Sequence, residues 1–283
     1  MFENKAQDQI SPEDKENYKK TAPMYMEKVQ STLKQFVRDW SIEGQKERDQ
    51  CYKPILEEID NLFGHLPPKE KSEVNILVPG AGLGRLAFDI AFKGYTCQGN
   101  EFSLFMLIAS NYVLNKCKSK NSCTIYPWIH QYTNNVSSVD QTKCITFPDI
   151  DPLDMPKDAN FSMVAGDFTE VYNDPSQYGS YDCVVTSFFI DCAHNIVEFV
   201  ELIHRILKPG GKWINFGPLL YHFSDVPRES SIELSYDIIK KIVEKTGFEF
   251  QREQLDCEAT YCQNPRSMLQ YTYKCVSFTG VKK

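Results

Sequence analysis

Residues 74–85 say most about how this chain folds. Val74–Val78 is a short apolar run, and a glycine-rich turn at residues 79–84 and an apolar helical pattern follow it directly. A strand that enters a helix through such a turn is typical of the first unit of an open parallel sheet. Gly80 and Gly82 allow the backbone to approach a ligand closely, and the following helix N-terminus presents backbone amides. The segment therefore predicts a ligand site at the end of the first strand.

The alternation of strand and helix continues along most of the chain. Further strands are expected at residues 95–99, 161–168, 181–190 and 213–216, and helices at 86–92, 103–116, 195–207 and 229–246. The last two strands, at about 248–255 and 270–278, have no helix between them, so they predict a hairpin whose final strand is inserted antiparallel. The expected fold class is α/β, with a Rossmann-like, mostly parallel sheet and an antiparallel last strand.

Three regions lie outside this alternation. Residues 1–23 read as a polar tail, and residues 24–71 carry two helical patterns that form an N-terminal addition. The addition is either a packing cap or a lid over a cofactor site. The domain of residues 72–283 contains a polar stretch at about 119–160, which is too long for a simple connection and is read as an insertion.

Composition excludes several classes of function. The chain has 283 residues, a net charge of −7 and no stripe of lysine and arginine, so no nucleic-acid partner is expected. No apolar run is long enough to span a bilayer, and the first residues lack the apolar core of a secretory signal, so no membrane partner is expected. The ten cysteines lack zinc spacing and are read as packing thiols in a reducing cytosol, without a metal.

Polar and aromatic positions at the next strand ends suit a nucleotide. Glu101 lies 21 residues after Gly80, where a carboxylate can bond both hydroxyls of a ribose. Asp167 can accept from an adenine amino group, and Phe168 can stack on a ring. A dinucleotide site would have a third glycine where Arg85 stands, which argues against a nicotinamide cofactor.

The following two strand ends carry candidate substrate groups. Asp191 comes after the strand at 181–190, where it is either an acid facing the substrate or the N-cap of the next helix. Phe188 can form a wall for a flat substrate. His222 follows the strand at 213–216 and is expected beside Asp191 across the top of the sheet. A single histidine is as often structural as functional, so its position alone leaves both readings open.

Five segments together resemble the carnosine N-methyltransferase family, which belongs to the class I S-adenosylmethionine-dependent methyltransferases. They are LVPGAGLGR (77–85), YPWIHQ (126–131), FFID (188–191), NFGPLLYHF (215–223) and SIELSY (231–236). The likeness runs from about residue 24 to the C-terminus, and it includes the helical addition and the insertion. The chain departs from the family at Cys192, where threonine is expected.

The resemblance implies a methyltransferase sheet, a reaction and a set of site residues. The reaction is methyl transfer from S-adenosylmethionine to an imidazole nitrogen of carnosine (β-alanyl-histidine), giving anserine and S-adenosylhomocysteine. The implied cofactor contacts are Gln35, Arg38, Gly80, Gly82, Glu101, Asp167, Phe168 and Ser187. The implied substrate contacts are Phe188, Asp191, His222, Tyr261, Tyr271 and Tyr273, with Asp191 and His222 as the catalytic pair. Gln35 and Arg38 would make the first helix a lid that grips the methionine carboxylate.

Methyl transfer to imidazole requires that the enzyme position the ring, and it does not require a strong base. Neutral imidazole, with a pKa of about 6.5, is already available as the nucleophile near pH 7. Asp191 and His222 are expected to orient the ring, with binding of a substrate cation as a second role for Asp191. Tyr271 and Tyr273, two apart on a strand, are expected to share a face.

Several alternatives remain at this point. The acceptor is a small imidazole dipeptide, carnosine or another, or a histidine within a protein; a deep pocket walled by residues 119–160 would favour a dipeptide. Two further readings are a silent adapter that kept the fold and a nicotinamide oxidoreductase. A cytoplasmic location is expected, with the nucleus as an addition, and both a monomer and a homodimer are considered.

Overall fold

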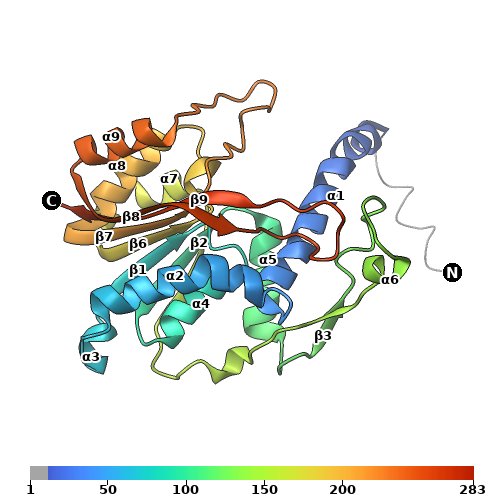
Figure 1. The fold of residues 1–283 in the computed structure, drawn as a ribbon, viewed down its shortest axis with the longest axis horizontal. Coiled ribbons are helices and arrows are strands. Elements are labelled where there is room, and N and C mark those ends of the chain that lie inside the picture. Colours follow the sequence, from blue (N-terminus) through green and yellow to red (C-terminus); the bar gives the residue numbers. More distant parts are fainter. Residues whose placement is uncertain (1–11) are drawn as a thin grey trace.

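The computed structural model describes residues 12–283, with side chains from residue 23 onward. A seven-stranded sheet forms the centre of the molecule (Figure 1). Its order is β5-β2-β1-β6-β7-β9-β8. The strands are β1 (Asn75–Pro79), β2 (Thr96–Glu101), β5 (Phe161–Ala165), β6 (Tyr181–Ser187), β7 (Leu207–Gly217), β8 (Phe248–Ala259) and β9 (Tyr273–Lys282). The pairs among the first five are parallel, and β9 runs antiparallel between β7 and β8. The predicted mostly parallel sheet with an inserted antiparallel last strand is confirmed.

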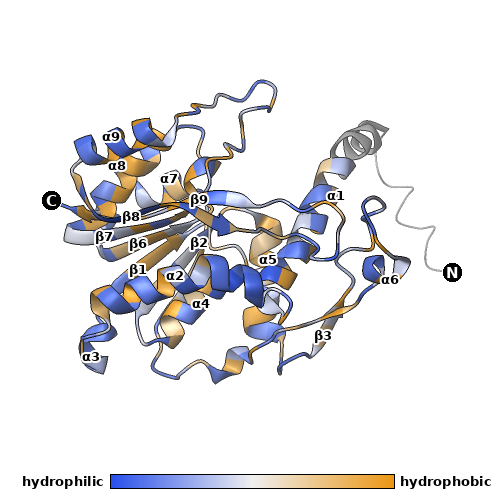
Figure 2. Cartoon of the chain, viewed as in Figure 1, coloured by the Kyte–Doolittle hydropathy of each residue, from blue (hydrophilic) through white to orange (hydrophobic). Residues whose placement is uncertain are grey.

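Helices cover both faces of this sheet. They are α1 (Pro12–Trp40), α2 (Gln45–Phe63), α3 (Pro68–Lys71), α4 (Arg85–Phe92), α5 (Leu104–Lys116), α6 (Ser138–Gln141), α7 (Phe168–Tyr172), α8 (Ile196–Ile206) and α9 (Tyr236–Thr246). On β1, Ile76 and Val78 pack with α2 and α4, whereas Leu77 packs with α7, α8 and α9 on the other face. Because both faces of β1 are buried from residue 76 onward, residues 76–79 form a continuous apolar run. Figure 2 shows the central strands mostly in the hydrophobic colour.

Some predicted boundaries differ from the structure. Of the predicted polar tail, residues 1–11 lie outside the described residues. The rest of that segment is not a tail, because helix α1 begins at Pro12. Helix α9 begins at Tyr236 and not at residue 229, because its N-cap residue Ser235 has extended backbone dihedrals. The Tyr221 hydroxyl donates to the Leu234 carbonyl and accepts from the Leu234 amide, which occupies both backbone groups of that residue.

The predicted insertion forms a small lobe beside α1. Its two short strands, β3 (Cys123–Ile125) and β4 (Ile145–Phe147), pair antiparallel. Trp128 is fully buried against Val37 of α1. Asp149, just after β4, forms ion pairs with both Arg48 of α2 and Arg85 of α4. The lobe is therefore tied to the helical addition and to the helix that follows the glycine turn.

Within the described part of the chain, no helix combines the length and the apolar character that crossing a bilayer requires. All ten cysteines are free thiols. Five of them are buried in the core, as the reading of packing thiols expects, but Cys144 is exposed and Cys192 lines the main cavity.

Candidate active site

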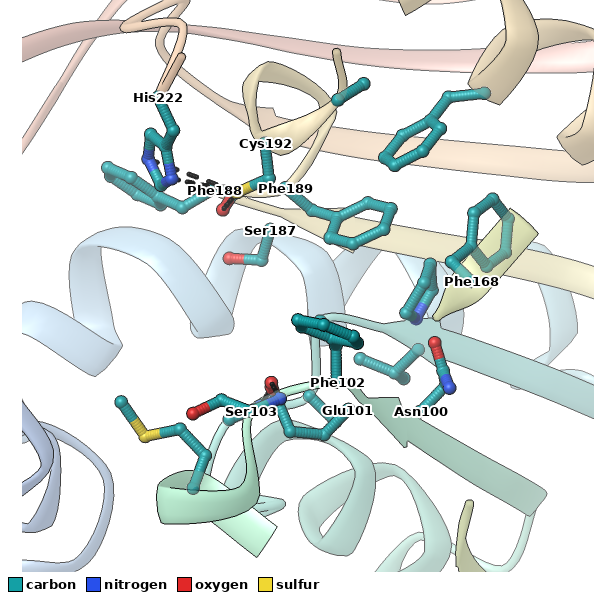
Figure 3. A pocket seen from close by; sticks show the side chains of 18 of the residues that line it. Asn100, Glu101, Phe102, Ser103, Phe168, Ser187, Phe188, Phe189, Cys192 and His222 are labelled. Carbon is teal, nitrogen blue, oxygen red and sulfur yellow. Dashed lines mark hydrogen bonds between the residues drawn. The ribbon is translucent and has the colours of Figure 1, made fainter. Parts of the chain in front are cut away.

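A cavity of about 560 Å³ opens at the carboxyl ends of the parallel strands. That volume is typical of a small-molecule site, and the position is where open α/β sheets bind ligands. The predicted site residues that line it are Gln35, Arg38, Gly80, Gly82, Glu101, Asp167, Phe168, Ser187, Phe188, His222 and Tyr261. Figure 3 shows His222, Cys192 and Ser187 on one side of the cavity and Glu101, Phe102 and Ser103 on the other.

The glycine turn and Glu101 form one wall. Gly80 has a φ of +65°, and a Cβ atom there would lie 2.4 Å from the ring of Phe189. The Gly82 amide donates to Glu101 Oε2 at 2.8 Å, and the Ser103 amide donates to Oε1 at 2.7 Å. Each carboxylate oxygen keeps a lone pair for a further donor. Burial raises the pKa of the Glu101 carboxyl, while these backbone amides act in the opposite direction.

Asp167 and Phe168 begin the helix α7 at the adjoining wall. Asp167 is the N-cap, because its Oδ1 accepts from the amides of Thr169 and Glu170. Sequence reasoning did not assign this role. Phe168 packs edge-on against Phe189, with ring centroids 5.5 Å apart, and it is 3% exposed. Its ring therefore forms part of the apolar floor of the cavity.

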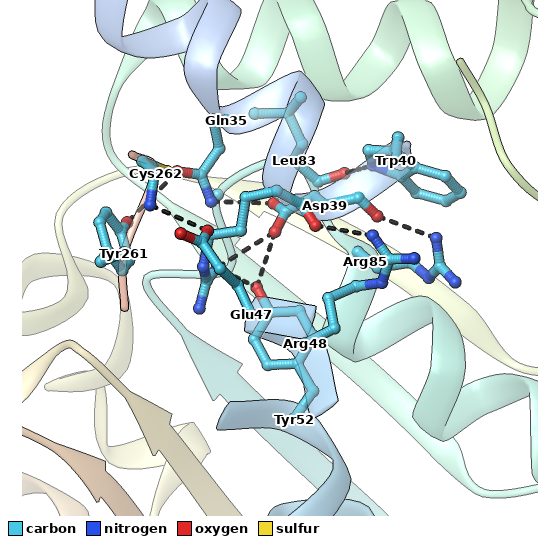
Figure 4. A network of polar contacts seen from close by, with 12 residues as sticks. Gln35, Asp39, Trp40, Glu47, Arg48, Tyr52, Leu83, Arg85, Tyr261 and Cys262 are labelled. Carbon is cyan, nitrogen blue, oxygen red and sulfur yellow. Dashed lines mark hydrogen bonds and ion pairs between the residues drawn. The ribbon is translucent and has the colours of Figure 1, made fainter. Parts of the chain in front are cut away.

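Helix α1 contributes Gln35 through a buried polar network that also contains Asp39, Tyr52 and Tyr261 (Figure 4), and Arg38 of the same helix belongs to this network. Arg38 Nη1 donates to Asp39 and to the Tyr52 hydroxyl, and its guanidinium lies 4.6 Å from the ring centroids of both Tyr52 and Tyr261. Gln35 donates to Asp39 Oδ2 at 3.0 Å and accepts from the Tyr261 hydroxyl at 3.3 Å. The helical addition thus forms part of the cavity wall itself.

Three buried polar atoms, two on residues that line the cavity and one on Asp191 next to the cavity-lining Cys192, have no partner among the described residues. They are Arg38 Nε, Ser187 Oγ and Asp191 Oδ1. Buried polar atoms are nearly always hydrogen-bonded in proteins, so such atoms at a cavity indicate a polar ligand. The donor at Arg38 fits a carboxylate, and the acceptor at Asp191 fits an N–H group.

Asp191 and His222 lie next to each other, as predicted. Asp191 is 2% exposed and is not among the residues that line the cavity; its Oδ2 accepts from the Leu220 amide at 2.8 Å. The His222 amide donates to the Asp191 carbonyl at 3.0 Å, which joins the loops after β6 and β7. The reading of Asp191 as the cap of α8 is wrong, since Asn195 caps that helix through the Val197 amide. Burial raises the pKa of the Asp191 carboxyl.

The three tyrosines differ in position. Tyr261 lines the cavity, with its ring centroid 4.8 Å from that of Phe188. Tyr273 packs on the edge of Phe188, with ring centroids 5.8 Å apart. Tyr271 is 63% exposed, and because β9 begins at Tyr273 it does not share a strand face with that residue. The expectation of a shared strand is therefore wrong, and neither Tyr271 nor Tyr273 lines the cavity.

Sequence reasoning missed Asp39, Tyr52 and Cys192. Asp39 and Tyr52 hold Arg38, and only their proximity in space reveals it. The sequence places Cys192 only as a departure from the family and as one of the packing thiols, but its Sγ lies 3.5 Å from His222 Nδ1 at the cavity. Its place directly after Asp191 was the one available signal.

The family is shown by comparison with known proteins. The model of the family "Carnosine N-methyltransferase" matches residues 15–283. A protein of that name from Mus musculus is 53% identical, over 98% of this chain and 68% of its own length. The chain belongs to the carnosine N-methyltransferase family. It is accordingly an N-methyltransferase.

Other family members are similarly close. "Carnosine N-methyltransferase unmet" of Drosophila melanogaster is 50% identical over 89% of this chain. The match covers 54% of the length of the Drosophila protein. The Schizosaccharomyces pombe protein is 43% identical over 88% of this chain and 69% of its own. Among solved structures, a magnesium protoporphyrin IX methyltransferase from Synechocystis has a TM-score of 0.49 and 11% identity, covering 86% of this chain and 88% of its own.

Proposed function

We propose that the protein transfers the methyl group of S-adenosylmethionine to an imidazole nitrogen of carnosine, giving anserine and S-adenosylhomocysteine. The observation that carries the proposal is the proximity of buried Asp191 to His222, which lines a cavity that Arg38 and Glu101 also line. Asp191 and His222 can hydrogen-bond the two nitrogens of an imidazole. Arg38 and Glu101 can bind the carboxylate and the ribose hydroxyls of a nucleoside that carries an amino-acid group. The names of the family members support the same acceptor.

The residues of the cavity fit S-adenosylmethionine. The unpaired Arg38 Nε would bind the methionine carboxylate, and the free lone pairs of Glu101 would accept from the ribose hydroxyls. Asp167 lines the cavity and would accept from the adenine amino group, while Gly80 keeps the turn free of side chains. When bound, the cofactor supplies an electrophilic methyl group on a sulfonium.

Asp191 and His222 then act on the acceptor by holding it. The unpaired Asp191 Oδ1 would accept the N–H of one ring nitrogen, which leaves the lone pair of the other directed at the methyl group. A nucleophile held in line at about 3–3.5 Å reacts far faster than one that is free in solution. As the new N–C bond forms and the S–C bond to the methyl group breaks, the positive charge would pass to the ring, where the Asp191 carboxylate would stabilise it. The proton on the other ring nitrogen would then be released to solvent.

The shape of the cavity supports a small acceptor. Helix α1 and Tyr261 close one side, and the rings of Phe188 and Phe223 form part of the wall. Among the described residues, none from the insertion at 119–160 lines this cavity. The closure comes from the helical addition and from the loop before β9, and not from the insertion.

The test is mass spectrometry of products made from S-adenosylmethionine with carnosine, homocarnosine, free histidine or a histidine-containing peptide. A gain of one methyl group on carnosine is expected. The gain should be lost in Asp191→Asn and kept in Asp158→Asn, a change at an exposed aspartate. A gain on the peptide and not on carnosine would overturn the dipeptide proposal and move the acceptor to a protein histidine.

A further inference from the structure

Three side chains next to the proposed acceptor position form a set of metal ligands. One ligand atom each from Asp191, Cys192 and His222 lies within 4.8 Å of the others. Carboxylate, thiolate and imidazole are the groups that bind zinc in proteins. The resemblance to the family gives no reason to expect this set, because threonine is expected at position 192.

The spacing of the thiol and the imidazole matches zinc coordination. With Zn–S of about 2.3 Å and Zn–N of about 2.0–2.1 Å, a tetrahedral ion holds S and N about 3.5 Å apart. Cys192 Sγ lies 3.5 Å from His222 Nδ1. The same sulfur lies 4.0 Å from Nε2, so the imidazole has to rotate to direct the Nδ1 lone pair at an ion that Cys192 also binds. The carboxylate has to approach by about 1 Å.

An unpaired buried acceptor points to a ligand independently of this spacing. Asp191 is 2% exposed, and its Oδ1 has no partner among the described residues, whereas Oδ2 accepts from the Leu220 amide. A buried carboxylate oxygen without a partner is costly in free energy, and a cation removes that cost.

The backbone also brings the three donor residues together before any ion arrives. Asp191 and Cys192 belong to one short 3₁₀ turn, Ile190–Cys192, and the His222 amide donates to the Asp191 carbonyl at 3.0 Å. Both Cys192 and His222 line the cavity, so an ion can reach them from solvent and keep its fourth position open to water.

We propose that Asp191, Cys192 and His222 form a zinc-binding site that inhibits the enzyme. The Cys192 thiol releases its proton to solvent as the Zn–S bond forms, and no electron transfer takes place. The ion occupies Asp191 and His222, so it competes with the imidazole substrate. This inhibitory effect rests on the proposed function, whereas the coordination itself does not.

Metal binding is tested first, without substrate and on the full chain. Titration with Co²⁺ should give a thiolate-to-metal absorption band, and calorimetry should show Zn²⁺ binding that is at least tenfold weaker in Cys192→Thr. Cys144→Ser, at an exposed cysteine, and Cys123→Ser, which breaks a thiol pair 3.7 Å apart, should bind Zn²⁺ as the unchanged protein does. Equal affinity in Cys192→Thr, or Co²⁺ bound without the band, would overturn the site.

Turnover is tested second, with free Zn²⁺ held constant by a chelator buffer because carnosine itself binds metals. Zinc should raise KM for carnosine, and the fold inhibition should drop at least tenfold in Cys192→Thr when each variant is compared with its own uninhibited rate. Equal inhibition of both proteins would overturn the proposal. A protein that binds zinc through Cys192 but methylates no imidazole would contradict the proposed function and leave the metal site standing.

Discussion

Arg38 and Asp39, neighbours in the sequence, form an ion pair in which Nη1 lies 3.1 Å from Oδ1, and the two side chains are 3% and 0% exposed. The same carboxylate accepts from Gln35 Nε2 and from the Tyr52 hydroxyl. One buried aspartate thus holds both residues of α1 that are proposed to contact the cofactor. It also links them to α2.

Asp39→Asn should weaken cofactor use without abolishing the reaction. A hydrogen bond to a charged group contributes about 1.5–3 kcal/mol, which corresponds to a loss of about 10- to 150-fold in kcat/KM for S-adenosylmethionine. Steady-state rates at varied cofactor measure it, with Asp49→Asn at an exposed aspartate as the control. Tyr52→Phe, which removes only the hydroxyl, should show a smaller change in the same direction. Normal kinetics in both variants would mean that Arg38 needs no such support.

Glu101→Gln should lower affinity for the nucleotide. Glutamine keeps one acceptor oxygen and replaces the other oxygen by an NH₂ donor. Glu101 accepts from the Gly82 amide through one oxygen and from the Ser103 amide through the other, so the new NH₂ group faces one of these two N–H donors and that hydrogen bond is lost. We expect S-adenosylhomocysteine to bind about 10- to 100-fold more weakly by calorimetry, as the loss of a charged hydrogen bond implies. Glu249→Gln, at an exposed glutamate, is the matched control. Unchanged binding would remove Glu101 from the ribose site.

Asp191→Asn should stop turnover and at the same time stabilise the fold. Because burial raises the pKa of this carboxyl in the folded state, the folded protein holds the proton more tightly than the unfolded chain does. Ionised Asp191 therefore lowers the free energy of unfolding. This loss of stability is absent below the pKa of the carboxyl in the unfolded chain, about 3.9, and is fully present above its pKa in the folded protein. Thermal unfolding should show the variant with the higher Tm at pH 8 and a gap that closes as the pH falls. A lower Tm at pH 8 would contradict this account.

Asp149→Ala should destabilise the molecule more than any surface change. Its carboxylate pairs with Arg48 and Arg85, all largely buried, so the variant leaves two guanidinium groups without their partner. Removing one partner of a buried ion pair costs about 3–5 kcal/mol. Chemical denaturation measures this loss, and Asp154→Ala, at an exposed residue of the same insertion, should change the free energy of unfolding by less than about 0.5 kcal/mol. A loss that is equally small in Asp149→Ala would show that the two arginines find other partners.

The parts of the molecule that follow simple periodicity could be predicted from the sequence. The unit of β1, the glycine turn and α4 was expected within one or two residues, and the two loops that carry Asp191 and His222 meet because they follow neighbouring parallel strands. Residues 229–235 were misread as helix, because their polar and apolar alternation does not reveal that the Tyr221 hydroxyl binds Leu234.

The polar network around Arg38 lies beyond such reasoning. Its members come from α1, α2 and the loop that contains Tyr261, and no spacing in the sequence links these segments. Only the packing of the helical addition against the hairpin brings them together. The same holds for Cys192, whose contact with His222 depends on how two loops are joined.

β9 lies between β7 and β8, so β8 leaves the ribosome before the strand with which it pairs. Until residues 273–282 follow, β7 presents an open edge, and the loop that carries Tyr261 lacks the strand that anchors its C-terminal end. Open strand edges are sites of aggregation in nascent chains. The cavity is therefore completed late in synthesis, and any chain cut short before Tyr273 yields a protein that is inactive and prone to self-association.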